Sequence, residues 1–424
     1  MDASNHNSNK NSPNNALESL GLYFSIPFCR GKCTYCNFAS GVYPASDHAR
    51  YVERLIADLV HAPKWADSMQ VKLPRSVDTI YFGGGTPVLL APGLFTRIFS
   101  SIRDNFNVTS DAEITVECAP GQLTDATLEA LAAAGVNRIS LGVQSFIDRE
   151  AQLSGRFHTR DLVLEDLRRL RAAGIHNLNI DLLAGLAEQT IASWRESLAV
   201  LTDTAVPHAS VYMLEIDEDS RLGRELISGG ARYSAGLVPS DDAIAQMYEE
   251  AVSYFAQAGL GQYEISNFAR GEAQASRHNL RYWQRRPYLG LGLDASSMLR
   301  SSDTQDGTVL RTSTTSDLAE YLAGDQPPLE TAWLGPTQQL EEAWFLGLRR
   351  NSGVAIQSLR KEFGAPAIEP TVAAARRLAE DGLLTIEKKP KGKETVRLTD
   401  RGRLISNDVF AEFLGLAPVP SFAN

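Results

Sequence analysis

The sequence predicts an α/β protein built on parallel strands, followed by a smaller α+β domain. Strand-like apolar runs occur at residues 22–27, 77–82, 112–117, 137–143, 177–183 and 208–214. Helix-like stretches separate them at residues 47–62, 92–105, 124–134, 161–173 and 190–203. Because strands that alternate with helices are joined by parallel βαβ crossovers, we expect a barrel or part of one.

A weak internal repeat supports this architecture. The segment LAAAGVNRISL at 131–141 is echoed by LRAAGIHNLNI at 170–180 and by FAQAGLGQYEI at 255–265. In the first two copies, Gly135 and Gly174 fall where the end of a helix needs a left-handed residue before the next strand begins. The repeat therefore predicts regular βα units.

At 424 residues the chain is longer than one hydrophobic core usually supports, so several domains are expected. Residues 1–17 are rich in Asn and Ser without an apolar period, which predicts a disordered tail. We expect the barrel over residues 18–240, an extension of its core over 241–335 and a C-terminal domain over 336–424. Within the extension, the polar segment 301–316 predicts an exposed hairpin or loop.

The C-terminal domain is expected to end like a winged helix. Helical patterns near 340–348, 356–363 and 371–380 precede a basic hairpin at 382–399. A DNA-binding wing would need a strongly basic face, but acidic residues such as Glu369 and Asp381 are interleaved here, and the whole chain carries a net charge of −10. We therefore expect no nucleic-acid binding, and a lid or partner-docking role instead.

Composition indicates a cytoplasmic protein. Apolar residues make up 43% of the chain and charged residues 22%, which is ordinary for a globular protein. The sequence has four cysteines, no signal peptide and no apolar run approaching 18 residues. Reduced thiols and no stable membrane insertion are therefore expected.

Three cysteines within eight residues, Cys29, Cys33 and Cys36, are the most informative feature of the chain. One tight loop can aim three thiolates at a single point, which suits three corners of a cubane iron–sulfur cluster and leaves one iron open for a small molecule. A structural zinc site would need a fourth ligand, for which the candidates are His48, His61 and the distant Cys118. Since neighbouring side chains of a strand face opposite ways, Cys118 is expected to point away from Glu117 and to be a buried thiol.

Other unusual residues collect at the predicted strand ends. The turn FGGGTP at 82–87 lets backbone N–H groups approach a ligand closely, although it lacks the Lys and Ser or Thr of a P-loop. Glu117, Gln144 and Asp181 stand at the ends of the third, fourth and fifth strands. Since the carboxyl ends of parallel strands meet at one face, these groups predict a pocket for a polar cofactor.

The chain resembles the radical S-adenosylmethionine superfamily, in the branch that contains oxygen-independent coproporphyrinogen III dehydrogenase and the HemW family of haem chaperones. The motifs that carry this resemblance are YFSIPFC at 23–29, FGGGTP at 82–87, RISLGVQSF at 138–146, NIDLLAGL at 179–186, YEISNF at 263–268 and HNLRYW at 278–283. They span roughly residues 20–415. The resemblance implies a partial (β/α)6 radical SAM barrel.

The resemblance also implies site residues. Cys29, Cys33 and Cys36 would hold a [4Fe–4S] cluster, whose fourth iron binds the amino and carboxylate groups of S-adenosylmethionine. The positions that match the S-adenosylmethionine site are Tyr23, Gly84, Gly85, Thr86, Glu117, Gln144, Arg156 and Asp181. In chemical terms, Glu117 can pair with the amino group, Arg156 with the carboxylate, and Asp181 or Gln144 with the ribose or adenine.

Within the branch, Phe38 favours the haem chaperones, because the dehydrogenase has a further cysteine two residues after the third. His278 then becomes the expected axial ligand of haem, beside the aromatic Tyr282 and Trp283; the alternative is an ordinary packed histidine. The expected function is transfer of haem to an acceptor protein, with oxidative decarboxylation of coproporphyrinogen III as the alternative. A membrane-bound acceptor would require transient docking.

Three positions depart from the pattern of this branch. Ser25 and Ser296 stand where histidines are usual, and Ala119 stands where an asparagine is usual. Each change is expected to remove a polar group from near the site, which weakens the case for substrate-radical chemistry more than the case for binding the cluster and haem.

Overall fold

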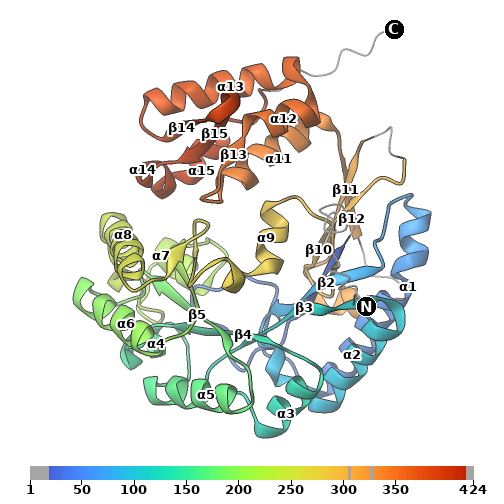
Figure 1. The fold of residues 1–424 in the computed structure, drawn as a ribbon. Coiled ribbons are helices and arrows are strands. Elements are labelled where there is room, and N and C mark those ends of the chain that lie inside the picture. Colours follow the sequence, from blue (N-terminus) through green and yellow to red (C-terminus); the bar gives the residue numbers. More distant parts are fainter. Residues whose placement is uncertain (1–18, 304–306, 325–328, 417–424) are drawn as a thin grey trace, which may run out of the picture.

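The parallel sheet expected from the sequence is present in the computed structural model, which describes residues 19–303, 307–324 and 329–416 (Figure 1). The expected tail at 1–17 lies outside these residues. Six parallel strands are neighbours in chain order: β1 Leu20–Ile26, β2 Ser76–Gly84, β3 Asn107–Cys118, β4 Arg138–Gln144, β5 Asn177–Ala184 and β6 His208–Met213. The helices between them are α1 Ala45–Ser68, α2 Pro92–Asn105, α3 Asp125–Ala133, α4 Asp148–Leu153, α5 Arg160–Ala172 and α6 Ile191–Asp203. The six predicted strands and five predicted helices are confirmed, and only the short α4 was not expected.

Local signals explain where these helices begin and end. Threonines precede α3, α5 and α6, and their hydroxyls accept hydrogen bonds from the first turn of each helix. After α3 and α5, Gly135 and Gly174 both have φ of +84°. Only glycine adopts this conformation without steric cost, so the repeated glycines return the chain to the next strand.

The sheet continues beyond the six parallel strands on both sides. Next to β6 lie the antiparallel β8 Asn267–Ala269 and β7 Gly261–Gln262, and next to β1 lie β9 Tyr288–Leu291, β10 Ser296–Arg300, β11 Val309–Thr314 and β12 Leu329–Leu334. β9 is parallel to β1, whereas β10 to β12 are antiparallel. The helices of this part are α7 Arg221–Ser228, α8 Asp241–Gln257, α9 Arg277–Trp283 and α10 Leu318–Leu322. The region 241–335 thus extends the sheet of the barrel, while its exact limits stay a prediction.

One expectation for this region is corrected. The segment 301–316 does include the second strand of a hairpin, but Val309 and Leu310 of β11 are buried. Its many Ser and Thr residues suggested full exposure, yet the strand pairs on both sides, with β10 and with β12. A strand inside a sheet can bury one face however polar the other is.

The C-terminal domain has the element order of a winged helix. Its elements are α11 Pro336–Leu348, β13 Val354–Ala355, α12 Ile356–Phe363, α13 Ala365–Glu380, β14 Leu384–Lys389, β15 Lys393–Leu398, α14 Asp400–Leu404 and α15 Ser406–Ala411. The three strands form a separate antiparallel sheet. Trp344 is fully buried and stacks on Phe413, with 4.6 Å between ring centroids, in a core that is separate from that of the barrel.

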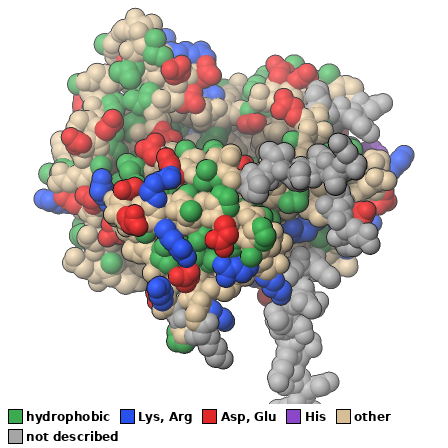
Figure 2. All heavy atoms as spheres, turned by 90° about the horizontal axis from the view of Figure 1, so that it is seen from above, with side chains coloured by type: hydrophobic (Ala, Val, Ile, Leu, Met, Phe, Trp, Pro, Cys, Tyr) green, Lys and Arg blue, Asp and Glu red, His purple; other side chains and the backbone are tan. Residues whose placement is uncertain are grey.

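Backbone contacts join this domain to the barrel beside α9. The amide of Ile265 donates to the carbonyl of Arg349, and the amide of Asn351 donates to the carbonyl of Tyr263. The guanidinium of Arg349 also lies 4.3 Å from the ring centroid of Trp283. The face seen from above the C-terminal domain carries interspersed acidic and basic side chains (Figure 2).

No helix in the described ranges is both long and apolar enough to span a membrane.

Candidate functional site

A cavity of about 550 Å³ lies at the carboxyl ends of the parallel strands. The predicted site residues in its lining are Cys29, Cys33, Cys36, Gly84, Gly85, Thr86, Glu117, Gln144, Arg156 and Asp181. They come from the loop after β1, from the carboxyl-terminal parts of β2 to β5 or the residues just after them, and, for Arg156, from the segment between α4 and α5. Parallel strands thus bring together groups that are up to about 150 positions apart in the chain.

The cysteine loop is closed by backbone hydrogen bonds. The amide of Cys29 donates to the carbonyl of Gly41, and the amide of Gly41 returns to the carbonyl of Pro27. The loop also rests on the segment before Arg156, because the amide of Thr34 donates to the carbonyl of Ser154. The three thiols are free and partly exposed, so they are held at the cavity on a fixed loop.

The arrangement of these thiols bears on the zinc alternative. Among the residues that the structure describes, no three His, Cys, Asp or Glu side chains are grouped as a metal ion would require. A single zinc ion needs all its sulfur ligands at about 2.3 Å. In a cubane cluster each thiolate binds a different iron, so the three sulfur atoms can lie farther apart than they would around a single metal ion.

The glycine-rich turn lies beside the cysteine loop. The amide of Thr86 donates to the carbonyl of Phe28 over 2.7 Å, and a Cβ at Gly85 would lie only 2.7 Å from the carbonyl oxygen of Ile26. Such an approach leaves no room for a side chain at Gly85. The turn therefore places backbone and the Thr86 hydroxyl, 3.9 Å from Cys29 Sγ, at the edge of the cavity.

Glu117 enters the cavity from the end of β3. The hydroxyl of Tyr81 donates to its Oε1 over 2.8 Å. Burial raises the pKa of Glu117 to about 7, although the bond from Tyr81 opposes the rise. The neighbouring Cys118 is 3% exposed and belongs to the hydrophobic core, as expected for a buried thiol, although it also borders the cavity.

The raised pKa of Glu117 predicts a pH-dependent stability. Since the ordinary value is 4.5 and the folded value about 7, stability is lost as pH rises through this interval. Glu117→Gln has no such loss, so it should match the wild type near pH 5 and exceed its free energy of unfolding at pH 8 by up to about 3 kcal/mol. Urea denaturation at both pH values measures this, with the exposed Glu129→Gln as control. Equal gains at both pH values would contradict it.

Asp181 is held by a network of neutral groups. Asn179 Nδ2 and the Ser140 hydroxyl donate to its two carboxylate oxygens over 2.7 and 3.1 Å. Asn179 Oδ1 lies 2.6 Å from Nδ1 of the buried His208, and Nε2 of His208 lies 2.9 Å from the Tyr263 hydroxyl. Despite its burial the carboxylate is therefore fixed in position, ready to accept hydrogen bonds from a ligand.

Arg156 and Gln144 meet above β4. A Cβ at Gly142 would lie 3.3 Å from both terminal nitrogens of Arg156, so the missing side chain makes room for the guanidinium. Arg156 donates to the Tyr35 hydroxyl over 3.1 Å, while its buried Nε has no partner among the described residues. Gln144 has φ of +69°, a strained conformation for a residue other than glycine. Such strain at a cavity is typical of a binding site.

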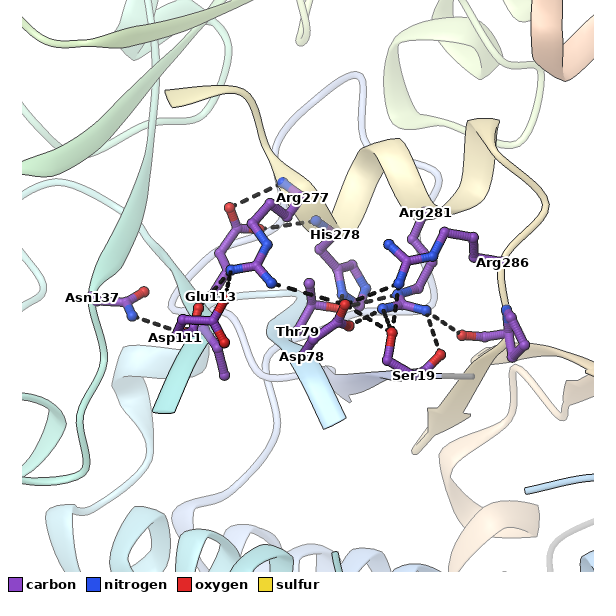
Figure 3. Close-up of polar contacts among 12 residues, drawn as sticks. Ser19, Asp78, Thr79, Asp111, Glu113, Asn137, Arg277, His278, Arg281 and Arg286 are labelled. Carbon is purple, nitrogen blue, oxygen red and sulfur yellow. Dashed lines mark hydrogen bonds and ion pairs between the residues drawn. The ribbon is translucent and has the colours of Figure 1, made fainter. Parts of the chain in front are cut away.

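Two predicted residues are not in the cavity lining. Tyr23 stacks on Tyr81 with 6.0 Å between centroids, behind the lining. His278 is 1% exposed, and one ring nitrogen lies 2.9 Å from the Thr79 hydroxyl (Figure 3). The other ring nitrogen lies 2.8 Å from the Tyr282 hydroxyl. Burial lowers the pKa of His278 to about 3, so the ring is neutral. In this state the structure offers no free nitrogen of His278 to an axial metal.

The three departures from the family pattern lie in different places. Ala119 lines the cavity, whereas Ser25 is buried behind it and Ser296 is exposed on β10. Of the three positions, Ala119 is therefore in the cavity lining, and the effect of the three changes on the site stays a prediction.

Several lining residues were missed by the sequence analysis. They are Tyr35, Tyr81, Arg138, Ser140, Asn179, Ser210, Tyr212, Asn267 and Asn279. A signal for some of them existed, because alternate residues of a strand share a face. Ser140 and Arg138 stand four and six positions before Gln144, and Asn179 stands two positions before Asp181. An even spacing along a strand places these residues on the same face.

The residues present fit an iron–sulfur cluster with a zwitterionic ligand. Three free thiols face the cavity, beside a carboxyl group that a cation would ionise and a guanidinium whose Nε has no partner. Amino and carboxylate groups are the natural complements of such a pair. The fold and the site together define a radical SAM protein.

Comparison with known proteins agrees. Residues 23–201 match the Radical SAM superfamily, and residues 334–405 match the HemN C-terminal domain. The chain is 31% identical to the heme chaperone HemW of Lactococcus lactis over 92% of this chain and 96% of that protein. It is also 31% identical to the heme chaperone HemW of Bacillus subtilis, over 93% and 98%. The chain therefore belongs to the HemW family.

A solved structure shares the fold. Coproporphyrinogen III oxidase (HemN) from Escherichia coli, a radical SAM enzyme, superposes with a TM-score of 0.77 at 22% identity, over 93% of this chain and 90% of that one. The radical SAM family implies a [4Fe–4S] cluster and S-adenosylmethionine as cofactors.

Proposed function

We propose that the protein is a cytoplasmic haem chaperone, which binds a [4Fe–4S] cluster, S-adenosylmethionine and haem and passes the haem to an acceptor protein. The observation that carries the proposal is the match, over nearly the whole length, to proteins named heme chaperone HemW. Phe38 supports it, because this side chain is 64% exposed at the cavity where the dehydrogenase of the branch has a further cysteine. An aromatic ring there can neither bind iron nor exchange a proton.

The residues of the cavity would divide the cofactors between them. Cys29, Cys33 and Cys36 would hold the cluster, and Glu117 and Arg156 would bind the amino and carboxylate groups of S-adenosylmethionine. When bound, this pair can supply one-electron chemistry. The remaining predicted contacts are Tyr23, Gly84, Gly85, Thr86, Gln144 and Asp181. Of these, Tyr23 would act from behind Tyr81.

Ligation of haem by His278 requires a local opening. Nε2 must exchange its partner Tyr282 for iron, while Nδ1 can stay bonded to Thr79 and fix the orientation of the ring. The side chain is neutral, which is the form that binds metals. The Tyr282 hydroxyl therefore competes with haem iron for one nitrogen.

Haem titration of the purified protein tests this ligand. His278→Ala is expected to lose the shift of the Soret band, and Tyr282→Phe to bind haem about fivefold more tightly, because a hydrogen bond worth about 1 kcal/mol no longer competes. The exposed His176→Ala serves as the control. An unaltered Soret spectrum in His278→Ala would exclude His278 as the ligand.

The enzyme alternative is tested separately. Anaerobic incubation with coproporphyrinogen III, S-adenosylmethionine and a reductant should give no multiple-turnover formation of protoporphyrinogen. Sustained turnover would replace the chaperone proposal by oxidative decarboxylation. The acceptor, whether soluble or docked transiently at a membrane, can be sought by following haem from the loaded protein to apoproteins.

A further inference from the structure

Arg138 is a buried cation at the start of β4 that none of the roles above uses. Its side chain lines the cavity on the face shared with Ser140 and Gln144, and the residue is only 2% exposed. Arg138 begins the strand and Gln144 ends it, so the two are separated by about 20 Å of strand. Arg138 therefore belongs to the inner end of the cavity, beyond the cysteine loop.

The guanidinium of Arg138 lacks a protein partner. Within residues 19–303, 307–324 and 329–416 it forms no hydrogen bond or ion pair, and its Nε is fully buried. The buried Arg281 is the opposite case, since it bonds Asp78 and the carbonyls of Ser19 and Pro287. A buried cation without a partner is costly, which is why buried arginines are nearly always paired.

The surroundings of Arg138 favour an anion. The charge of Arg138 favours the ionised form of Asp181 in the same lining, but the two carboxylate oxygens of Asp181 already accept hydrogen bonds from Ser140 and Asn179. Asn279 of α9 also lines the cavity, and its side-chain amide makes no hydrogen bond within the described part of the chain. Burial lowers the pKa of both His208 and His278, and the charge of Arg138 lowers it further. The second effect reflects a positive potential in this part of the barrel.

We propose that Arg138, assisted by the Asn279 amide, binds a carboxylate of the ligand that enters the cavity beyond the cofactor. This inference rests on the proposed function, under which that carboxylate is a propionate of haem. A planar guanidinium suits a carboxylate because it can donate two parallel hydrogen bonds. The HNLRYW motif then contributes Asn279 to the cavity, whether or not His278 binds the iron.

Haem and haem dimethyl ester, in which both propionates are blocked, distinguish this role. The wild type is expected to bind haem on the order of tenfold more tightly than the ester, since a hydrogen bond to a charged group is stronger than one between neutral groups. Arg138→Gln should bind the two equally, and Arg138→Lys should keep part of the preference. The exposed Arg149→Gln is the matched control, and thermal unfolding checks that each variant is folded.

The outcomes separate the inference from the proposed function. Equal binding of haem and ester by the wild type would overturn the carboxylate site and leave the chaperone proposal standing. Failure of the wild type to bind either would overturn both. Equilibrium dialysis with S-adenosylmethionine completes the test: loss of cofactor binding in Arg138→Gln, with the preference for haem intact, would assign the cation to the cofactor and overturn the inference.

Discussion

Single replacement of Cys29, Cys33 or Cys36 by alanine is expected to abolish assembly of the iron–sulfur cluster. Each thiolate would bind a different iron, so two remaining ligands leave two irons without protein ligands. After anaerobic reconstitution, iron and acid-labile sulfide should fall below about a tenth of the wild-type content, and the absorption near 400 nm should disappear.

Cys118→Ala is the matched control for this experiment. Cys118 is buried in the hydrophobic core and lies outside the cysteine loop, so its removal should leave iron and sulfide unchanged. A small loss of stability is expected from the cavity. If Cys118→Ala lost the cluster as fully as Cys29→Ala, or if the wild type carried zinc in place of iron, the assignment of the three ligands would be wrong.

Replacement of Asp78 by asparagine is expected to destabilise the fold more than any other polar change near α9. Its carboxylate pairs with Arg281, which is fully buried, and with Arg286, and it accepts a hydrogen bond from Ser19 (Figure 3). Removing the acid leaves buried guanidinium groups uncompensated, which costs about 3–5 kcal/mol. Urea denaturation, followed by circular dichroism, measures the change in the free energy of unfolding.

A second acid on the same surface provides the comparison. Asp111 pairs with Arg277 at 3.6 Å, but its side chain is 76% exposed. Asp111→Asn should therefore cost less than about 1 kcal/mol. Similar losses in the two variants would show that burial does not set the strength of the Asp78 network.

Much of the barrel could be predicted because its signals are local. Apolar runs, helix caps and the glycines at 135 and 174 each act within a few residues, and they fixed the order of strands and helices. The cavity face followed from parallel topology, since Glu117 and Gln144 lie at the ends of β3 and β4 and Asp181 lies within the neighbouring β5.

The remaining features depend on contacts between distant segments. The sheet extension from β9 to β12 contains short strands whose polar residues resemble a loop until their pairing is known. The burial of His278 depends on Thr79, 199 positions away, and no local pattern reveals such a contact. Arg138 begins β4, where an arginine gives no local signal of a site that is marked by residues at the opposite ends of the strands.

The hydrogen bonds around Tyr263 have a consequence for communication between domains. The carbonyl of Tyr263 accepts the amide of Asn351 in the winged-helix domain, and its hydroxyl leads through His208 and Asn179 to Asp181. Under the proposed function, an acceptor protein that docks on the outer domain and displaces Asn351 would pull on the backbone of Tyr263, at one end of this relay. Binding of the acceptor to the outer domain and binding of the cargo in the barrel would then be thermodynamically linked, and the acceptor would promote release without contacting the cargo.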